Sequence, residues 1–193
     1  MGLELLSQLN FLDFIVLIVL LRICYISAKT GLSVEIFKFL GVLFSTYIAL
    51  HYYTALSDVI QKRFLPKNMP LEFIDFITFL SLIIAVYLCF VGIRTILSRF
   101  VQLDTIPKIN QLAGLVLGIG RGFLVIGLLS FTLVISSVAY LSNSVKYSYF
   151  ARKTFAISPQ TYDWLWSNIF SKFSPNEKFN STVMEVKDNF NRK

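Results

Sequence analysis

Residues 112–141 read LAGLVLGIGRGFLVIGLLSFTLVISSVAYL, and this stretch decides the fold. It contains a single charge, Arg121, and three glycines, Gly114, Gly118 and Gly122, that recur at every fourth position. A cation is costly in hydrocarbon, so a helix that carries one hides it against protein, water or lipid headgroups. Small residues at every fourth position form a stripe on which a second helix can lie closely. The stretch therefore indicates a membrane helix that packs tightly within a bundle.

The composition of the whole chain points to the same class of protein. Of its 193 residues 55% are hydrophobic, and the mean hydropathy is +0.67. The formal net charge is +7, and the basic residues lie between apolar segments and along the C-terminal end. At such places anionic lipid headgroups are the simplest partner. We therefore expect an all-α, polytopic membrane protein that has the lipid bilayer as partner and does not bind nucleic acid.

Four segments are long enough to cross a hydrocarbon core, which takes about 20 apolar residues. We predict spans over about residues 5–28, 38–57, 75–95 and 112–141, which together form a transmembrane domain of residues 1–141. A short turn ending at Gly31 joins the first two spans, and the polar stretch 58–70 forms a loop or interfacial turn before the third. The fourth segment exceeds the hydrocarbon thickness, so part of it must tilt, break or leave the core.

The C-terminal residues 142–193 have a different composition and form a tail. Ser158 and Pro159 are typical of a helix start, and they predict an amphipathic helix over about residues 159–173. Its apolar stripe consists of Tyr162, Leu165, Trp166, Ile169, Phe170 and Phe173. We predict that this stripe lies at the membrane interface or on the end of the bundle, with a partner's soluble domain as the alternative. The polar end beyond Asn176 is expected to be mobile.

Four spans place both termini on one side of the membrane. Basic residues near the spans number six on that side and six or seven on the other, so the positive-inside rule does not decide the orientation. In the first hairpin, Glu4 and Asp13 precede or begin the first span, and Lys29 follows it. This order favours cytoplasmic loops around Lys29 and Lys108 and periplasmic termini.

Arg121 has two interpretations. In the first, the bundle buries it against a carboxylate, with Asp13 as the preferred partner and Glu35 as a rival. In the second, the fourth span begins at Gly122 and the guanidinium reaches the membrane boundary. Hydropathy favours the second, because residues 122–141 are long enough to span alone. The glycine stripe also has two interpretations, internal packing, which is favoured, and a dimer face.

Catalysis has little support in the sequence. His51 is the only histidine and lies in an aromatic cluster expected at the interface, and Cys24 and Cys89 fall in apolar segments. No set of nucleophile, base and orienting residue can be recognised. Phosphate-loop and dinucleotide fingerprints are missing as well. We therefore expect no enzymatic activity, no cofactor and no metal site.

An ordered set of residues resembles one known family. Asp13 begins the first helix, Gly31 ends the first turn, Glu35 comes early in the second helix, and a G-x-x-x-G-x-x-R-G run extends from Gly114 to Gly122. This order is similar to that of the colicin V production protein (CvpA) family, small bacterial inner-membrane proteins with four predicted spans. The resemblance covers roughly residues 9–140. Where that family has an Asp-Arg pair before the glycine run, this chain has Asn110 and Gln111.

The resemblance implies an accessory protein of the bacterial inner membrane. It would be required for toxin production or export, or for envelope maintenance, and would work with other inner-membrane or secretion proteins. The family is not known as an enzyme family. From the residues alone a second function remains open, a small channel or transporter assembled as a homo-oligomer around Arg121, Asp13 and the glycine face.

Overall fold

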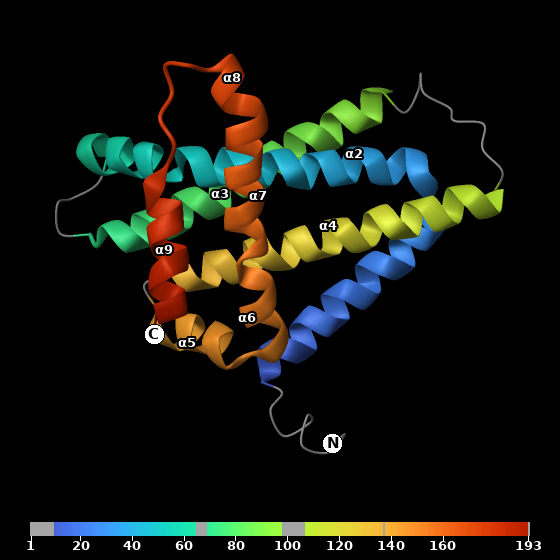
Figure 1. The fold of residues 1–193 in the computed structure, drawn as a ribbon, viewed down its shortest axis with the longest axis horizontal. Coiled ribbons are helices and arrows are strands. Elements are labelled where there is room, and N and C mark those ends of the chain that lie inside the picture. Colours follow the sequence, from blue (N-terminus) through green and yellow to red (C-terminus); the bar gives the residue numbers. More distant parts are fainter. Residues whose placement is uncertain (1–9, 65–68, 98–106, 137, 193) are drawn as a thin grey trace.

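The computed structural model describes residues 10–64, 69–97, 107–136 and 138–192, and within these ranges it contains helices and no strand. The all-helical class expected from the sequence is therefore confirmed for this part of the chain. The helices are α2 (Phe11–Phe64), α3 (Leu71–Leu97), α4 (Pro107–Ile135), α5 (Ala139–Tyr147), α6 (Tyr149–Phe155), α7 (Ile157–Leu165), the π-helical turn η1 (Trp166–Phe170), α8 (Ser171–Phe173) and α9 (Ser181–Arg192) (Figure 1).

Helix α2 is bent at Gly31, where the backbone adopts φ 75° and ψ 176°. Only glycine adopts a positive φ of this kind without a steric penalty, so Gly31 divides α2 into arm 1 (residues 11–30) and arm 2 (residues 32–64). The two arms diverge from the bend like the sides of a V (Figure 1). The short turn expected between the first two spans is therefore a single residue.

Helix α4 lies between the two arms and starts beside the bend (Figure 1). A Cβ atom at Gly114 would come within 2.8 Å of the carbonyl carbon of Gly31, and one at Gly122 within 2.9 Å of Leu20. A Cβ atom at Gly118 would collide with the side chain of Ser27. The glycine stripe of α4 therefore faces arm 1, and the absent side chains allow the two helices to approach closely.

Three helices of the described chain are long and apolar enough to cross a membrane, namely 11–63, 71–96 and 108–135. The first of these contains the bend, so two of the four segments expected from the sequence belong to one helix. Arm 2 also continues to Phe64, and the loop expected over residues 58–70 is wrong for its first half. The side chain of Gln61 donates to the carbonyl of Met69 at 3.2 Å, which fastens this polar extension to the start of α3. Helix α4 ends at Ile135, before the expected end of the fourth span at Leu141.

The C-terminal helices cross the bundle. Helices α6, α7, η1 and α8 follow one another across the faces of α2 and α4, and α9 runs beside them (Figure 1). The amphipathic helix expected over residues 159–173 lies within this run. The expected mobile end does not match the structure over residues 181–192, which form α9. Its Val183 and Phe190 are buried, and the ring of Phe190 lies 4.3 Å from that of Phe155.

An aromatic core joins five of the helices at this crossing. It consists of Tyr53 from α2, Phe79 from α3, Phe131 from α4, Phe155 from α6 and Phe190 from α9, with ring centroids of neighbouring pairs 4.3 to 6.4 Å apart. Four of these side chains are at most 1% exposed. These rings pack in stacked, tilted or edge-to-face pairs, so this cluster fixes the C-terminal helices on the bundle.

The close approach of α4 to arm 1 predicts the effect of filling it. We expect Gly118→Val to lower the free energy of unfolding by about 1–3 kcal/mol, because the new side chain overpacks the contact with Ser27. Thermal unfolding of the detergent-purified protein measures this loss. Gly92→Val is the matched control, since Gly92 is exposed and has no neighbouring atom within 4 Å of the added Cβ. Equal losses for the two variants would contradict the packing role of the stripe.

Candidate functional site

A cluster of charged side chains is buried beside the bend of α2. The carboxylate of Glu35 on arm 2 forms an ion pair with Arg121 of α4, with 3.0 Å between Oε2 and a guanidinium nitrogen. Its other oxygen, Oε1, lies 2.6 Å from the ammonium of Lys38 and accepts a hydrogen bond from the hydroxyl of Thr30 at 2.9 Å. The side chain of Glu35 is fully buried, and those of Lys38 and Arg121 are 11% and 9% exposed. We call Glu35, Lys38 and Arg121 the charge cluster.

Local structure explains why these side chains meet. Glu35 follows Gly31 by one helical turn, so the bend directs it at the middle of α4, where Arg121 lies. Arg121 comes from α4, and its guanidinium also donates to the hydroxyl of Ser27 on arm 1 at 3.3 Å. Arg121 thus contacts both arms at once and holds the two arms of α2 against α4.

Asn110 completes the bend from outside α2. The backbone N–H of Leu32 lacks a helical acceptor after the bend, and it donates to the side-chain oxygen of Asn110 at 2.7 Å. This bond satisfies one of the free N–H groups that every helix start leaves, here at the start of arm 2. Asn110 therefore acts as a cap contributed by another helix. The only sequence signal for Asn110 is that it stands, with Gln111, where the family has an Asp-Arg pair.

The charge cluster carries a net positive charge, because one carboxylate faces two cations. Removal of one member of a buried pair leaves an uncompensated charge and costs far more than a surface ion pair contributes. In this cluster, removal of Arg121 and removal of Glu35 cost unequal amounts of stability. Without Arg121, Glu35 is still neutralised by Lys38, whereas without Glu35 both cations lose their partner.

Asp13 has a different role from the one expected. Its carboxylate accepts hydrogen bonds from the hydroxyl of Ser148 at 2.6 Å and from the backbone N–H groups of Phe150 and Tyr149 at 2.8 and 3.2 Å. It also accepts from the N–H of Asn10 at 2.9 Å. These are free N–H groups at the starts of arm 1 and α6, where a carboxylate is stabilised. The preferred pairing of Asp13 with Arg121 is therefore wrong, and Glu35, the rival, is the partner.

Burial of Arg121 also corrects the interpretation that hydropathy favoured. The residue is 8% exposed and its guanidinium points at Glu35 and Ser27 inside the bundle. Hydropathy is calculated along one segment of the chain. It therefore includes the unfavourable charge of Arg121 but not the carboxylate that neutralises this charge from a different helix.

The apolar stripe of the C-terminal helix packs largely on the bundle. Tyr162 and Leu165 are buried, so of the two positions expected for the stripe these two residues take the one on the bundle. Phe170 stacks on Tyr47 with ring centroids 3.6 Å apart, and Trp166 stacks on His51 at 5.1 Å. Ile169 and Phe173 are exposed, and their interfacial position stays a prediction.

Beside this stripe lies a polar network that the sequence did not reveal. The Nδ1 of His51 lies 2.9 Å from the hydroxyl of Tyr162, and its Nε2 lies 3.3 Å from Glu177. The hydroxyl of Tyr162 accepts from the backbone N–H of Asn180 at 2.9 Å, and the Asn180 amide donates to the carbonyl of Leu50 at 2.8 Å. Burial raises the pKa of Tyr162 to about 12, so its phenol stays neutral at physiological pH. The segment before α9 is thereby fastened to arm 2.

Within the described ranges, no group of three or more His, Cys, Asp or Glu side chains is arranged to hold a metal ion. The charge cluster consists of two cationic side chains and one carboxylate whose oxygens already contact both of them. Its geometry is that of an electrostatic link between helices.

Apolar helices long enough to span a bilayer, a glycine-mediated helix contact and a buried interhelical ion pair define a multi-pass α-helical membrane protein. The family model described as Colicin V production protein matches residues 12–159, a range that includes Asp13, the charge cluster and the glycine stripe. The chain therefore belongs to this family, and the resemblance found in the sequence is confirmed. Searches of curated proteins and of solved structures gave no match to the chain.

The charge cluster predicts an ordered set of stability losses. We expect Glu35→Gln to lower the free energy of unfolding by about 3–5 kcal/mol, because two buried cations then lack a carboxylate. Arg121→Gln is expected to cost less, since Lys38 still neutralises Glu35. The double variant should lose less than the sum of the two single losses. Denaturant unfolding of the purified protein in micelles measures all three.

Glu185→Gln serves as the control for this series, because Glu185 lies exposed on α9 and its loss should change stability by no more than about 0.5 kcal/mol. Additive losses, or a larger loss for Arg121→Gln than for Glu35→Gln, would contradict the proposed coupling in the cluster.

Proposed function

We propose that this protein is a non-enzymatic accessory protein of the bacterial inner membrane that is required for toxin production or export, or for maintenance of the envelope. The observation that carries the proposal is the family match over residues 12–159, which includes the bend, the charge cluster and the glycine stripe. In this role the protein acts through other inner-membrane or secretion proteins.

The internal contacts of the bundle support a scaffold. Gly114, Gly118 and Gly122 are buried against arm 1, so the surface that could pair with a second copy is used within the chain. Arg121 is held by Glu35 and Ser27. The alternative of a small oligomeric channel needs these groups to line a path between copies, and neither the family match nor these contacts favour it.

The arrangement of the helices also supports a four-span topology. Arm 1 leads to the bend, arm 2 returns from it, and α3 and α4 repeat this out-and-back course (Figure 1). We propose that each arm crosses the membrane, with α3 and α4 as the third and fourth spans. With this topology, the charge order of the first hairpin favours termini in the periplasm.

The accessory role predicts the outcome of a complementation experiment. In a bacterium whose own family member is deleted, expression of this chain should restore colicin V release or envelope resistance, and crosslinking should capture specific membrane partners. Glu35→Gln should reduce the restored activity several-fold, and the exposed control Glu185→Gln should leave it unchanged. Colicin V release and membrane levels of each variant are measured together.

A flux assay on the purified protein in liposomes distinguishes the alternative. The accessory role predicts no ion or solute flux above that of empty liposomes. Flux that disappears in Arg121→Ala, combined with failure to complement, would overturn the proposal in favour of a channel.

The topology predicts the behaviour of reporter fusions. Fusions after residue 67, which lies outside the described residues, and after the C-terminus should report the periplasm, while a fusion after Lys108 should report the cytoplasm. Paired alkaline phosphatase and green fluorescent protein reporters measure this. A cytoplasmic signal at the C-terminus would reverse the orientation, and opposite signals at residue 67 and the C-terminus would contradict four spans.

A further inference from the structure

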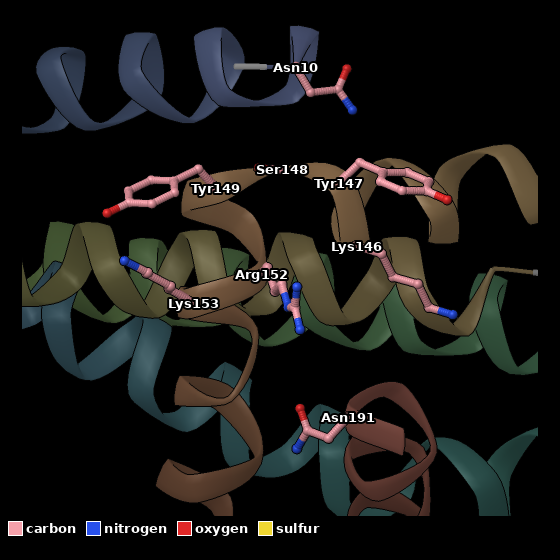
Figure 2. Close-up of a pocket in the computed structure, with 8 residues that line it drawn as sticks. All are labelled: Asn10, Lys146, Tyr147, Ser148, Tyr149, Arg152, Lys153 and Asn191. Atoms are coloured by element: carbon pink, nitrogen blue, oxygen red, sulfur yellow. The ribbon is translucent and has the colours of Figure 1, made fainter. Parts of the chain in front are cut away.

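An open cavity of about 810 Å³ lies at the elbow between α5 and α6. Its walls are formed by Asn10, Lys146, Tyr147, Ser148, Tyr149, Arg152, Lys153 and Asn191. Figure 2 shows Arg152 between the side chains of Lys146 and Lys153, with Asn10 and Asn191 on opposite sides. We call this space the elbow pocket.

The elbow pocket is strongly positive. Three of its eight lining residues are cations, and none of the eight is acidic. Lys153 is held over the ring of Tyr149, with its ammonium 3.9 Å from the ring centroid. Within the described chain Lys146 and Arg152 have no carboxylate partner, in contrast to Lys38 and Arg121. The pocket therefore presents an unneutralised charge that favours an anion.

The buried carboxylate of Asp13 does not cancel this charge. Asp13 lies behind the elbow and is 2% exposed. Its oxygens are occupied by the hydroxyl of Ser148 and the N–H groups of Tyr149 and Phe150. Asp13 therefore fixes the backbone of the elbow from inside, while the three cations face the cavity.

Exposed apolar side chains lead away from the pocket along arm 1. Phe11, Phe14, Ile18, Leu21 and Tyr25 are 44 to 64% exposed and recur every three or four residues, so they form one stripe on the helix. The stripe begins at Phe11, the residue after Asn10 of the pocket wall. A stripe of this kind on a membrane-spanning helix faces lipid chains.

Aromatic residues surround the pocket at the end of this stripe. Tyr140 is 66% exposed and stacks on Phe11 with ring centroids 6.1 Å apart, and Tyr147 is 77% exposed. Exposed aromatic rings beside basic side chains at the end of an apolar span are typical of the headgroup level of a membrane.

We propose that the elbow pocket binds the phosphate of an anionic phospholipid, with Lys146, Arg152 and Lys153 on the phosphate and the acyl chains along the stripe of arm 1. A soluble phosphoester offers the same anion, but it would leave the adjoining apolar stripe without an occupant. The volume exceeds that of a phosphate alone and accommodates a polar headgroup, with the exposed amide of Asn191 at the far wall. This inference requires that arm 1 lies in a membrane and is independent of the role in toxin production.

The test uses the full chain purified in a neutral detergent. Dioleoylphosphatidylglycerol should remain bound in native mass spectrometry and raise the melting temperature, and dioleoylphosphatidylcholine should do neither. The triple substitution Lys146→Gln, Arg152→Gln and Lys153→Gln should weaken phosphatidylglycerol binding on the order of a hundredfold, from the usual contribution of each cation near an anionic headgroup. The double substitution Lys146→Arg and Lys153→Arg keeps the charge and should keep the binding.

The matched control removes two lysines and one arginine from other exposed sites, as Lys62→Gln, Arg63→Gln and Lys172→Gln. This control should retain phosphatidylglycerol binding within about threefold, because it changes the net charge equally and leaves the elbow intact. Equal losses in both triple variants would overturn the proposal and show attraction to overall charge only. Binding of glycerol 3-phosphate with the same dependence on the three cations would overturn the assignment to a lipid.

Discussion

The ion pair between Glu35 and Arg121 is the constraint on which the arrangement of the bundle depends. A carboxylate and a guanidinium in a membrane-spanning bundle are tolerable only when they meet. Their meeting requires the bend at Gly31, which turns Glu35 toward α4, and the glycine stripe, which lets α4 lie against arm 1. The geometry of the two arms and α4 thus follows from one electrostatic requirement.

The helical class, the turn at Gly31 and the family could be predicted from the sequence. Apolar length, a glycine after a charged turn and the ordered set of motif residues are all local signals. The partner of Arg121 was assigned wrongly, because the sequence favoured Asp13 over Glu35 and only the placement of the helices in space shows which carboxylate is near. The same limit applies to Tyr162, whose apolar stripe is visible in the sequence although its contact with His51 across the fold is not.

Two carboxylates of the first hairpin serve the structure in opposite ways. Glu35 neutralises cations within the bundle, and Asp13 binds free backbone N–H groups where α6 begins. Arm 1 is therefore held at both of its ends, by Ser27 and Gly31 near the bend and by Asp13 at the elbow. Its middle turns have an exposed apolar face, which leaves that face to the surrounding lipid.

The cap on Leu32 has a consequence for the order of assembly. Asn110 lies 78 residues further along the chain than the N–H that it satisfies, and Arg121 follows it on the same helix. When the first hairpin leaves the ribosome, its bend still lacks this acceptor and the carboxylate of Glu35 has Lys38 as its only cationic partner and Thr30 as a hydrogen-bond donor. The hairpin of arms 1 and 2 is therefore completed only when α4 packs between them, and the folding of its bend is coupled to the synthesis of α4.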